Sequence, residues 1–349
     1  MKKLFKFLSY LVAILVLLFA IFVLYNTLAD YEPAPIVTVS EAKGEVINVY
    51  DTLNVFVWNI GYCGLGDDMS FFYDGGEKTR TSKNRTIENL QEISKLVKEQ
   101  KDIDFYLFQE LDLASHRSYK INQFDSIAAI LPQHKGYLGL NYKVAFVPVP
   151  ISDPLGKVES GLVTFTKHEP FQTDRYSFPG NYVWPKGLFL LDRCFLVQRF
   201  YTSNGRELLI INTHNSAYDD GSLRKRQMEM MKNFLLKEYA NGNYIIVGGD
   251  WNQNPPKKGL GSETEKEGHL TRIRIADNLM PAEWNWHFNE QIPTNRLINE
   301  VYNPATTVTT TIDFYLLSPN LKALSQRNID LKFKNSDHNP VLLSFEFVR

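Results

Sequence analysis

The chain contains a series of short apolar runs that are rich in β-branched and aromatic residues. Their near-continuous hydrophobicity is typical of strands covered on both faces. Helical periods lie between some of the runs, at residues 87–97 and 230–235. Strands and helices therefore share one core, which predicts an α/β domain with helices packed outside sheets. The predicted strands are residues 53–58, 105–108, 161–165, 208–211, 244–247, 312–317 and 341–345.

Side chains able to bind metal or phosphate follow most of these runs. Asn59 and Glu110 follow the first two, His214 follows a later one, and Asp250 and Asn252 follow the run that ends at residue 247. Polar groups gathered at strand ends are how α/β scaffolds build sites. We therefore expect these five side chains to share a pocket.

Two of the polar segments are especially informative together. Residues 248–252 read Gly-Gly-Asp-Trp-Asn, and residues 335–341 read Asn-Ser-Asp-His-Asn-Pro-Val. Each is composed of ordinary turn residues when taken alone. Both lie beside an apolar strand, so they predict that an Asp-x-Asn pair and an Asp-His pair enter one catalytic pocket.

Six segments resemble, in order, the motifs of the endonuclease/exonuclease/phosphatase superfamily. The resemblance covers about residues 52–349. It implies a four-layer α/β sandwich with two central mixed β-sheets flanked by helices, and metal-dependent hydrolysis of phosphate esters. The superfamily includes deoxyribonuclease-I-like nucleases, abasic-site endonucleases, neutral sphingomyelinases and inositol-phosphate phosphatases. The segments are Trp58-Asn59-Ile60-Gly61, Gln109-Glu110-Leu111-Asp112, Asn212-Thr213-His214, Gly249-Asp250-Trp251-Asn252, Ile312-Asp313-Phe314 and Ser336-Asp337-His338-Asn339-Pro340.

The chemistry of phosphate-ester cleavage agrees with the residue types. The reaction requires a divalent cation, an activated water and donors that stabilise the developing charge. Glu110 is a hard oxygen ligand of the kind that suits Mg²⁺, with Mn²⁺ as a substitute. Asn59 and Asp337 would complete or flank this metal site. The metal assignment depends on the resemblance, because so sparse a site has no signature of its own.

His338 is the candidate catalytic acid or base, because imidazole titrates near neutral pH. The resemblance assigns Asp313 as the partner that orients His338. Asp250 would orient or deprotonate the attacking water, while Asn252 and His214 would donate hydrogen bonds to the phosphate. Whether Asp250 or the His338–Asp313 pair is the base stays open.

These residues also have structural explanations. Glu110 could be a solvated strand end, Asn59 and Asn252 could be turn residues, and His214 could cap a strand. Asp313 is harder to explain in this way, because an unpaired carboxylate inside a strand is costly to bury. The chain departs from the family pattern after His214, where the polar residues Asn-Ser follow in place of an apolar one.

The N-terminal region predicts a membrane anchor. Three lysines precede an uncharged apolar stretch at residues 7–25, and a bilayer core takes roughly 20 such residues. Lysines before the stretch and acidic residues after it predict a cytoplasmic N-terminus and an extracytoplasmic catalytic domain. A cleaved signal peptide is the alternative. We expect an anchor at residues 1–29, a tether at residues 30–51 and a catalytic domain at residues 52–349.

The expected substrate is a phospholipid or sphingolipid head group. The connection at residues 61–85 is acidic and aromatic, and the net charge of −1 gives no basic field for nucleic acid. The aromatic segment at residues 179–189 could line a pocket or dip into a bilayer surface. An exported deoxyribonuclease-I-like endonuclease and an inactive anchored binding protein are the alternatives. We expect a monomer in which Arg117, Asn141 and Tyr142 contact the substrate.

The two cysteines, Cys63 and Cys194, fit no zinc spacing. A disulfide between them is possible on sequence grounds, but two buried free thiols are favoured.

Overall fold

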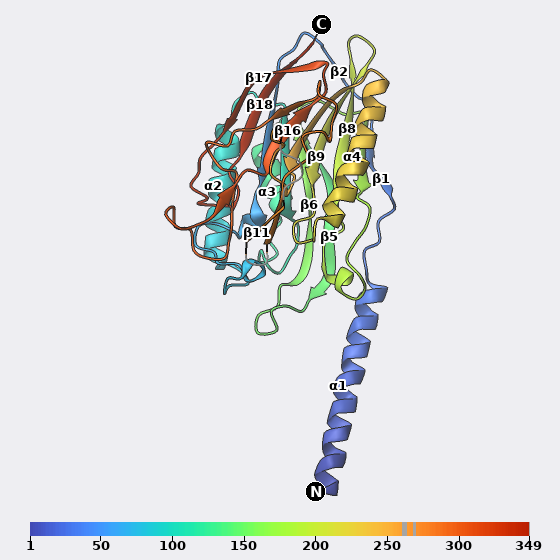
Figure 1. Cartoon of the computed structure of the whole chain (residues 1–349), viewed down its shortest axis with the longest axis vertical. Coiled ribbons are helices and arrows are strands. Elements are labelled where there is room, and N and C mark those ends of the chain that lie inside the picture. Colours follow the sequence, from blue (N-terminus) through green and yellow to red (C-terminus); the bar gives the residue numbers. More distant parts are fainter. Residues whose placement is uncertain (260–263, 268–269, 349) are drawn as a thin grey trace.

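Two mixed β-sheets form the centre of the computed structural model, which describes residues 1–259, 264–267 and 270–348 (Figure 1). Residues 260–263, 268–269 and 349, which the sequence places in the catalytic domain, lie outside the described residues. The helices are α1 (Lys2–Leu28), α2 (Lys83–Glu99), α3 (Gln123–Ile130) and α4 (Ser222–Ala240), with 3₁₀ turns η1 (Gly61–Cys63), η2 (Phe72–Asp74) and η3 (Lys186–Phe189).

The first sheet has eight strands, and β9 and β10 run parallel in its centre. Its order is β1-β7-β8-β9-β10-β16-β13, with β2 paired to β8. The strands are β1 (Ile36–Glu41), β2 (Val46–Ile47), β7 (Gln172–Ser177), β8 (Cys194–Thr202), β9 (Glu207–His214), β10 (Tyr244–Asp250), β13 (Asn285–His287) and β16 (Asp313–Leu317).

The second sheet has six strands in the order β17-β18-β3-β4-β6-β5, and β3 and β4 run parallel. Its strands are β3 (Leu53–Asn59), β4 (Phe105–Asp112), β5 (Lys135–Val147), β6 (Gly156–Thr166), β17 (Leu321–Asn328) and β18 (Val341–Phe347). Two small ribbons pair β11 (Thr264–Glu267) with β12 (Leu270–Ile273) and β14 (Asn295–Arg296) with β15 (Thr309–Thr310).

The layers follow from alternation along each strand. In β10, Ile246 belongs to the core between the two sheets, while Ile245 and Val247 belong to the core beneath α4. Helices α2 and α3 pack in the same way on the outer face of the second sheet. Both faces of the central strands are thus buried, which explains their near-continuous hydrophobicity. The predicted four-layer sandwich is confirmed.

Helix α1 projects from one end of the domain (Figure 1). It is long and apolar enough to cross a membrane. The residues that follow it differ from the expected tether at residues 30–51: β1 pairs with β7 and β2 pairs with β8. Alternating polar and apolar residues at 36–41 suit the edge of a sheet, where one face is half-covered. The link between helix and sheet is therefore short.

Both cysteine thiols are free and buried, as favoured from the sequence. Cys63 lies in the core beneath α2 and α3, and Cys194 lies in a separate small cluster with Leu196.

Asn212 on β9 joins the two sheets through buried hydrogen bonds. Its Oδ1 accepts from Gln109 Nε2 at 2.6 Å, and its Nδ2 donates to the carbonyls of Phe108 and Val163 at 3.1 and 3.2 Å. A buried polar group that loses its partner keeps its desolvation cost. This bridge therefore fixes how the first sheet sits on the second.

We predict that Asn212→Ala lowers the free energy of unfolding by about 2 kcal/mol, because one side chain and two carbonyls lose buried partners. Denaturant unfolding followed by circular dichroism measures this. The control is Asn285→Ala, whose amide donates to an exposed carbonyl and whose loss should change stability little. Equal stabilities of the two variants would contradict the role of the bridge.

Asp192 lies close to the acidic residues that follow α1. Burial raises the pKa of Asp192 to about 7, and Asp30 and Glu32 add to this increase while Arg175 opposes it. A carboxyl whose pKa is higher in the folded state binds protons preferentially in that state. Its contribution to stability is therefore lost as the pH rises through about 7.

We predict that Asp192→Asn raises the melting temperature at pH 8 relative to the wild type and changes it little at pH 4. The difference should grow between pH 4 and about 7, where the folded and unfolded carboxyls differ in protonation. Thermal unfolding of the full chain in detergent micelles measures it. Replacement of the exposed Asp51 by Asn serves as control, and a constant offset at all pH values would contradict the prediction.

Candidate active site

The carboxyl ends of strands from both sheets meet over one cavity of about 190 Å³. Asn59 ends β3, His214 ends β9 and Asp250 ends β10, while Glu110 lies near the end of β4. Parallel strands place their carboxyl ends at one edge of a sheet, which explains this convergence. Of the residues predicted from sequence, Glu110, Arg117, Tyr142, His214, Asp250, Asn252, Asp337 and His338 line the cavity.

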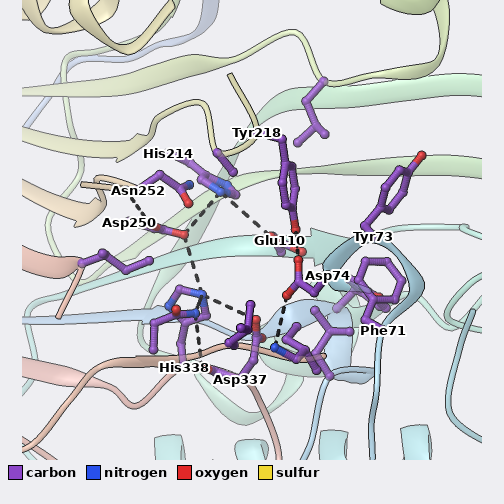
Figure 2. Close-up of a pocket in the computed structure, with 18 of the residues that line it drawn as sticks. Phe71, Tyr73, Asp74, Glu110, His214, Tyr218, Asp250, Asn252, Asp337 and His338 are labelled. Carbon is purple, nitrogen blue, oxygen red and sulfur yellow. Dashed lines mark hydrogen bonds and ion pairs between the residues drawn. The ribbon is translucent and has the colours of Figure 1, made fainter. Parts of the chain in front are cut away.

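Glu110 is aimed by a bulge in β4. Phe108 pairs with Val163 and Leu111 pairs with Gly161, so Gln109 and Glu110 together oppose one residue of β6. Glu110 has φ of 53°, a left-handed conformation that is uncommon for a side chain of this kind. Bulges of this type re-aim side chains beside active sites. Figure 2 shows the Glu110 carboxylate among the residues lining the cavity.

His338 and Asp313 form a buried pair. Nδ1 of His338 lies 2.8 Å from Oδ2 of Asp313, and the indole of Trp58 donates to the His338 carbonyl at 2.9 Å. The other ring nitrogen, Nε2, lies 3.8 Å from Asp250 Oδ2. Burial alone would lower the pKa of His338, but the nearby carboxylates, with Asp313 foremost, raise it well above its usual value. The imidazole therefore holds its proton at neutral pH.

Asp250 lies at the centre of the hydrogen-bonding network. Its Oδ2 accepts from Asn59 Nδ2 at 3.0 Å and lies 3.4 Å from His214 Nε2, while its Oδ1 accepts from the Asn252 backbone at 2.9 Å. Burial raises the pKa of Asp250 to about 6. Burial also lowers the pKa of His214 well below its usual value, with Arg193 and His338 contributing. His214 is therefore neutral near pH 7.

Asn59 connects two carboxylates rather than facing the cavity with its oxygen. Its Nδ2 donates to Asp250 and, at 3.4 Å, to Glu110 Oε1, while its Oδ1 accepts from the Gly61 backbone at 3.0 Å. Asn59 does not line the cavity. It flanks the predicted metal site and positions Glu110.

The Asp337 carboxylate packs directly against the backbone of Gly61. Its Oδ2 lies 3.7 Å from His338 Nε2, and a Cβ at Gly61 would meet Asp337 Oδ1 at 2.7 Å. Burial raises the pKa of Asp337 to about 7, and the Glu110 carboxylate contributes. Gly61 also has φ of +49°, which a glycine adopts without strain.

Asn252 forms a hydrogen bond with the polar segment that follows His214. The Asn252 amide donates to the Asn215 carbonyl at 2.9 Å. Asn215 and Ser216 bond in turn to Thr213 and to Gln227 on α4. The departure from the family pattern thus adds buried hydrogen bonds that connect His214 to α4.

The three predicted substrate contacts differ in placement. Arg117 lines the cavity, but its Nε and Nη2 donate to both oxygens of Asp112 at 3.1 and 2.9 Å. Tyr142 lines the cavity and donates its hydroxyl to the Phe189 carbonyl at 2.9 Å. Asn141 is buried outside the cavity lining, so its predicted contact with substrate is not supported by the structure.

Arg193 and Asn295 are among the cavity residues that were not predicted from the sequence. Arg193, just before β8, lines the cavity, and its Nη1 is buried without a hydrogen-bond partner. Glu110 and Asp250 act on it electrostatically. The Asn295 side-chain amide lies 2.9 Å from His338 Nε2, and with its oxygen turned toward the ring it accepts from the protonated imidazole. Neither lies in a recognisable motif, although the arginine precedes an apolar run.

Tyr218, Asp74 and Ile298 form a hydrogen-bonded group that also lines the cavity. Tyr218 donates its hydroxyl to Asp74 Oδ1 at 2.8 Å, and Asp74 Oδ2 accepts from the Ile298 backbone at 3.2 Å (Figure 2). These contacts join the turn η2, which precedes α2, to the segment that enters α4 and to the segment around Ile298. They bring the acidic and aromatic connection of residues 61–85 to the rim of the site.

A sequence model of the endonuclease/exonuclease/phosphatase family matches residues 56–338. The chain belongs to this family. The match covers the first five motifs identified from the sequence and the sixth as far as His338. Family membership supports hydrolysis of phosphate esters as the reaction class.

Solved structures show the same fold. An endonuclease/exonuclease/phosphatase protein from Beutenbergia cavernae has a TM-score of 0.56 at 16% identity, covering 85% of this chain and 72% of that one. ANGEL2, a 2′,3′-cyclic phosphatase, has a TM-score of 0.55 at 16% identity, with 89% and 100% covered. D. rerio TDP2 with a single-strand DNA product has a TM-score of 0.51 at 14% identity, with 84% and 99% covered. The curated proteins include no match to this chain.

The carboxylates of the site suit a divalent cation. Burial and the Glu110 carboxylate raise the pKa of Asp337, so negative charge is crowded where a cation would relieve it. Oxygen donors of this type suit Mg²⁺ or Mn²⁺. Asp250, Asp313 and His338 also place ligand atoms within 4.8 Å of one another. Because His338 and Asp313 already share a hydrogen bond, that group fits an acid–base pair better.

We predict that Gly61→Ala reduces phosphoesterase activity at least about tenfold, because the new methyl displaces the Asp337 carboxylate. The positive φ adds a stability cost of about 1–2 kcal/mol. Gly205→Ala is the matched control, since its φ is +79° and nothing lies within 4 Å of the added Cβ. Steady-state kinetics separates the two, and equal activities would contradict a catalytic need for this approach.

Proposed function

We propose that the chain is a membrane-tethered, metal-dependent phosphodiesterase that releases the head group of a phospholipid or sphingolipid. The observation that carries the substrate class is the composition of the cavity wall. Beside its carboxylates, histidines, arginines and asparagines, the wall carries a large share of apolar and aromatic side chains. The apolar lining includes Leu65, Phe71, Leu155, Leu190, Leu191 and Ile298.

Four arginines line the described cavity, and carboxylates pair with two of them, which favours one phosphate over a polyanion. Arg117 is paired with Asp112, and Arg224 is paired with Asp219 at 2.6 Å. Arg296, the third, donates to backbone carbonyls. Arg193 keeps a buried Nη1 without a partner, next to the catalytic carboxylates. A guanidinium in this position supports binding of a single phosphoryl oxygen.

The geometry supports a division of acid and base roles. Asp250, with its raised pKa, accepts the proton of the attacking water. His338 holds a proton on Nε2 and donates it to the leaving oxygen, while Asp313 keeps the ring oriented. His214 and Asn252 stabilise the phosphoryl oxygens. This arrangement favours Asp250 as the base, the choice that the sequence left open.

Glu110 and Asp337 would hold the divalent cation, flanked by Asn59. When bound, this cation neutralises charge on the phosphoryl oxygens. Glu110 has the more accessible carboxylate of the two, since its side chain is 23% exposed against 9% for Asp337.

We predict that His338→Ala and Glu110→Ala each reduce turnover on the order of 100- to 10,000-fold while the chain stays folded, because these side chains serve the reaction. His287→Ala and Glu346→Ala, outside the cavity, are matched controls. Circular dichroism checks folding. Loss of structure in either catalytic variant would favour the structural explanation of these residues.

The experiment that tests the substrate class uses the full chain in detergent micelles. It is incubated with Mg²⁺ or with chelator and with one mixture of phospholipids, sphingolipids, inositol phosphates and short duplex DNA. Mass spectrometry of the products should show metal-dependent release of lipid head groups. Release of inorganic phosphate from inositol phosphates, with intact lipids, would reject the diesterase proposal.

An exported endonuclease is the second candidate, because a structural neighbour was solved with a DNA product. The arrangement of the arginines disfavours an endonuclease, since two of the arginines that line the described cavity are paired with carboxylates. Cleaved DNA with intact lipids would establish it. An inactive binding protein is disfavoured because each predicted catalytic position carries a competent side chain, and absence of any product would revive it.

A further inference from the structure

Two segments of the domain expose apolar side chains at the end from which α1 projects. The β5–β6 connection, with the end of β5, carries Phe146, Val149 and Ile151, and the segment before η3 carries Val183 and Trp184. Ile151 is 91% exposed and Val183 is 86% exposed. We call these five residues the apolar rim. Both segments lie at the same end of the domain as α1 in Figure 1.

The rim contacts the last turns of α1. The Phe22 ring stacks on Phe189 with centroids 5.8 Å apart, and it meets Phe146 edge-on at 6.3 Å. The Trp184 indole donates to Thr27 Oγ1 at 3.2 Å. Helix and rim are therefore in direct contact through both segments.

The contact with Phe22 sets the height of the rim along the helix. The uncharged stretch at residues 7–25 is about 29 Å long as a helix, which matches a hydrocarbon core of about 30 Å. Phe22 lies three residues before the end of this stretch, or about 4.5 Å inside it. Side chains that touch Phe22 consequently lie at the boundary between hydrocarbon and head groups, where Trp is favoured.

We propose that the apolar rim docks into the bilayer that α1 crosses and holds the catalytic cavity against the lipid surface. The inference rests on the proposed tethering and deepens the proposed function. Its partner is a lipid bilayer, because the rim is continuous with the apolar surface of the helix. Five exposed apolar side chains on two segments are otherwise an unfavourable surface in water.

The same two segments continue into the catalytic cavity. Leu155 ends the β5–β6 connection, Leu190 and Leu191 follow η3, and all three line the cavity. A second cavity of about 220 Å³ adjoins it and shares Tyr73, Leu190, Leu191, Arg193 and Tyr218 with it.

The second cavity leads from the catalytic site toward the rim. Tyr182 and Lys186, on either side of the exposed Val183 and Trp184, also line it, and the Lys186 ammonium lies 4.5 Å from the Tyr182 ring. A lipid could therefore pass from the bilayer along this second cavity, with its phosphate meeting Arg193 and its apolar part facing the leucines. Docking by the rim places the entrance of this route at the membrane surface.

Fluorescence quenching tests docking without any need for activity. The full chain is reconstituted into phosphatidylcholine vesicles that carry bromines at a shallow or a deep position of the acyl chains. Trp58, Trp251 and Trp284 are buried and Trp286 is partly so, so Trp184 is the tryptophan exposed at the rim. We expect shallow bromines to quench more than deep ones, and Trp184→Phe to abolish this difference. Equal quenching in wild type and Trp184→Phe would overturn the proposal.

Aspartate substitutions test the consequence for catalysis. Ile151→Asp and Val183→Asp should each lower hydrolysis of vesicle lipid roughly fivefold or more, because a charge opposes insertion at the interface. Hydrolysis of a soluble ester, bis(p-nitrophenyl) phosphate, should stay within about twofold of wild type, because neither residue lines the catalytic cavity. Leu324→Asp on β17 introduces the same charge at another exposed apolar position and should leave both activities unchanged.

The two experiments separate the possible failures. Quenching without lipid hydrolysis would support the rim and reject the proposed substrate. Lipid hydrolysis that is equal in wild type and both rim variants would reject docking while keeping the proposed function. Failure of the full chain to stay with the vesicles would reject the tethering, and with it the docking proposal.

Discussion

The buried hydrogen bond between Gln109 and Asn212 fixes the position of one sheet on the other beneath the active site. One sheet supplies Asn59 and Glu110, and the other supplies His214 and Asp250. An apolar interface alone tolerates sliding, whereas buried polar groups need specific partners. The bridge therefore sets the separation of two half-sites that neither sheet could form alone. Like the Gln109–Asn212 bond, the Asn59–Asp250 and His338–Asp313 hydrogen bonds also link the two halves of the site.

The central strands could be predicted because strands buried on both faces are runs of almost continuously apolar residues. Strand β10 has every residue buried, and its run of apolar residues was found. Strand β17 mixes exposed and partly buried positions at the edge of its sheet, and β1 does the same at the edge of the other sheet. Edge strands like these are decided by pairing with a neighbour, which residue types alone do not specify. The short link after α1 was missed for the same reason.

The convergence of the candidate site residues was predictable because they are concentrated in short motifs at strand ends. The structure places Glu110, Asp250, Asp337 and His338 around one cavity, with Asp313 bonded to His338. Arg193 was missed because its importance arises from its three-dimensional neighbours. Arg117 is the opposite case, since it was predicted to contact the substrate, whereas its guanidinium is paired with the carboxylate of Asp112. Pairing of charges is a tertiary property and cannot be read from spacing.

The length of the free link decides how closely the domain follows the membrane. A tether at residues 30–51 could extend about 70 Å and would leave the cavity free to turn in solution. In the structure, the Ala34 and Pro35 carbonyls already accept hydrogen bonds from Ser177. About six residues then remain after α1, which span at most about 20 Å. A link this short keeps the apolar rim near the bilayer whenever α1 is inserted, so docking needs to overcome little loss of freedom.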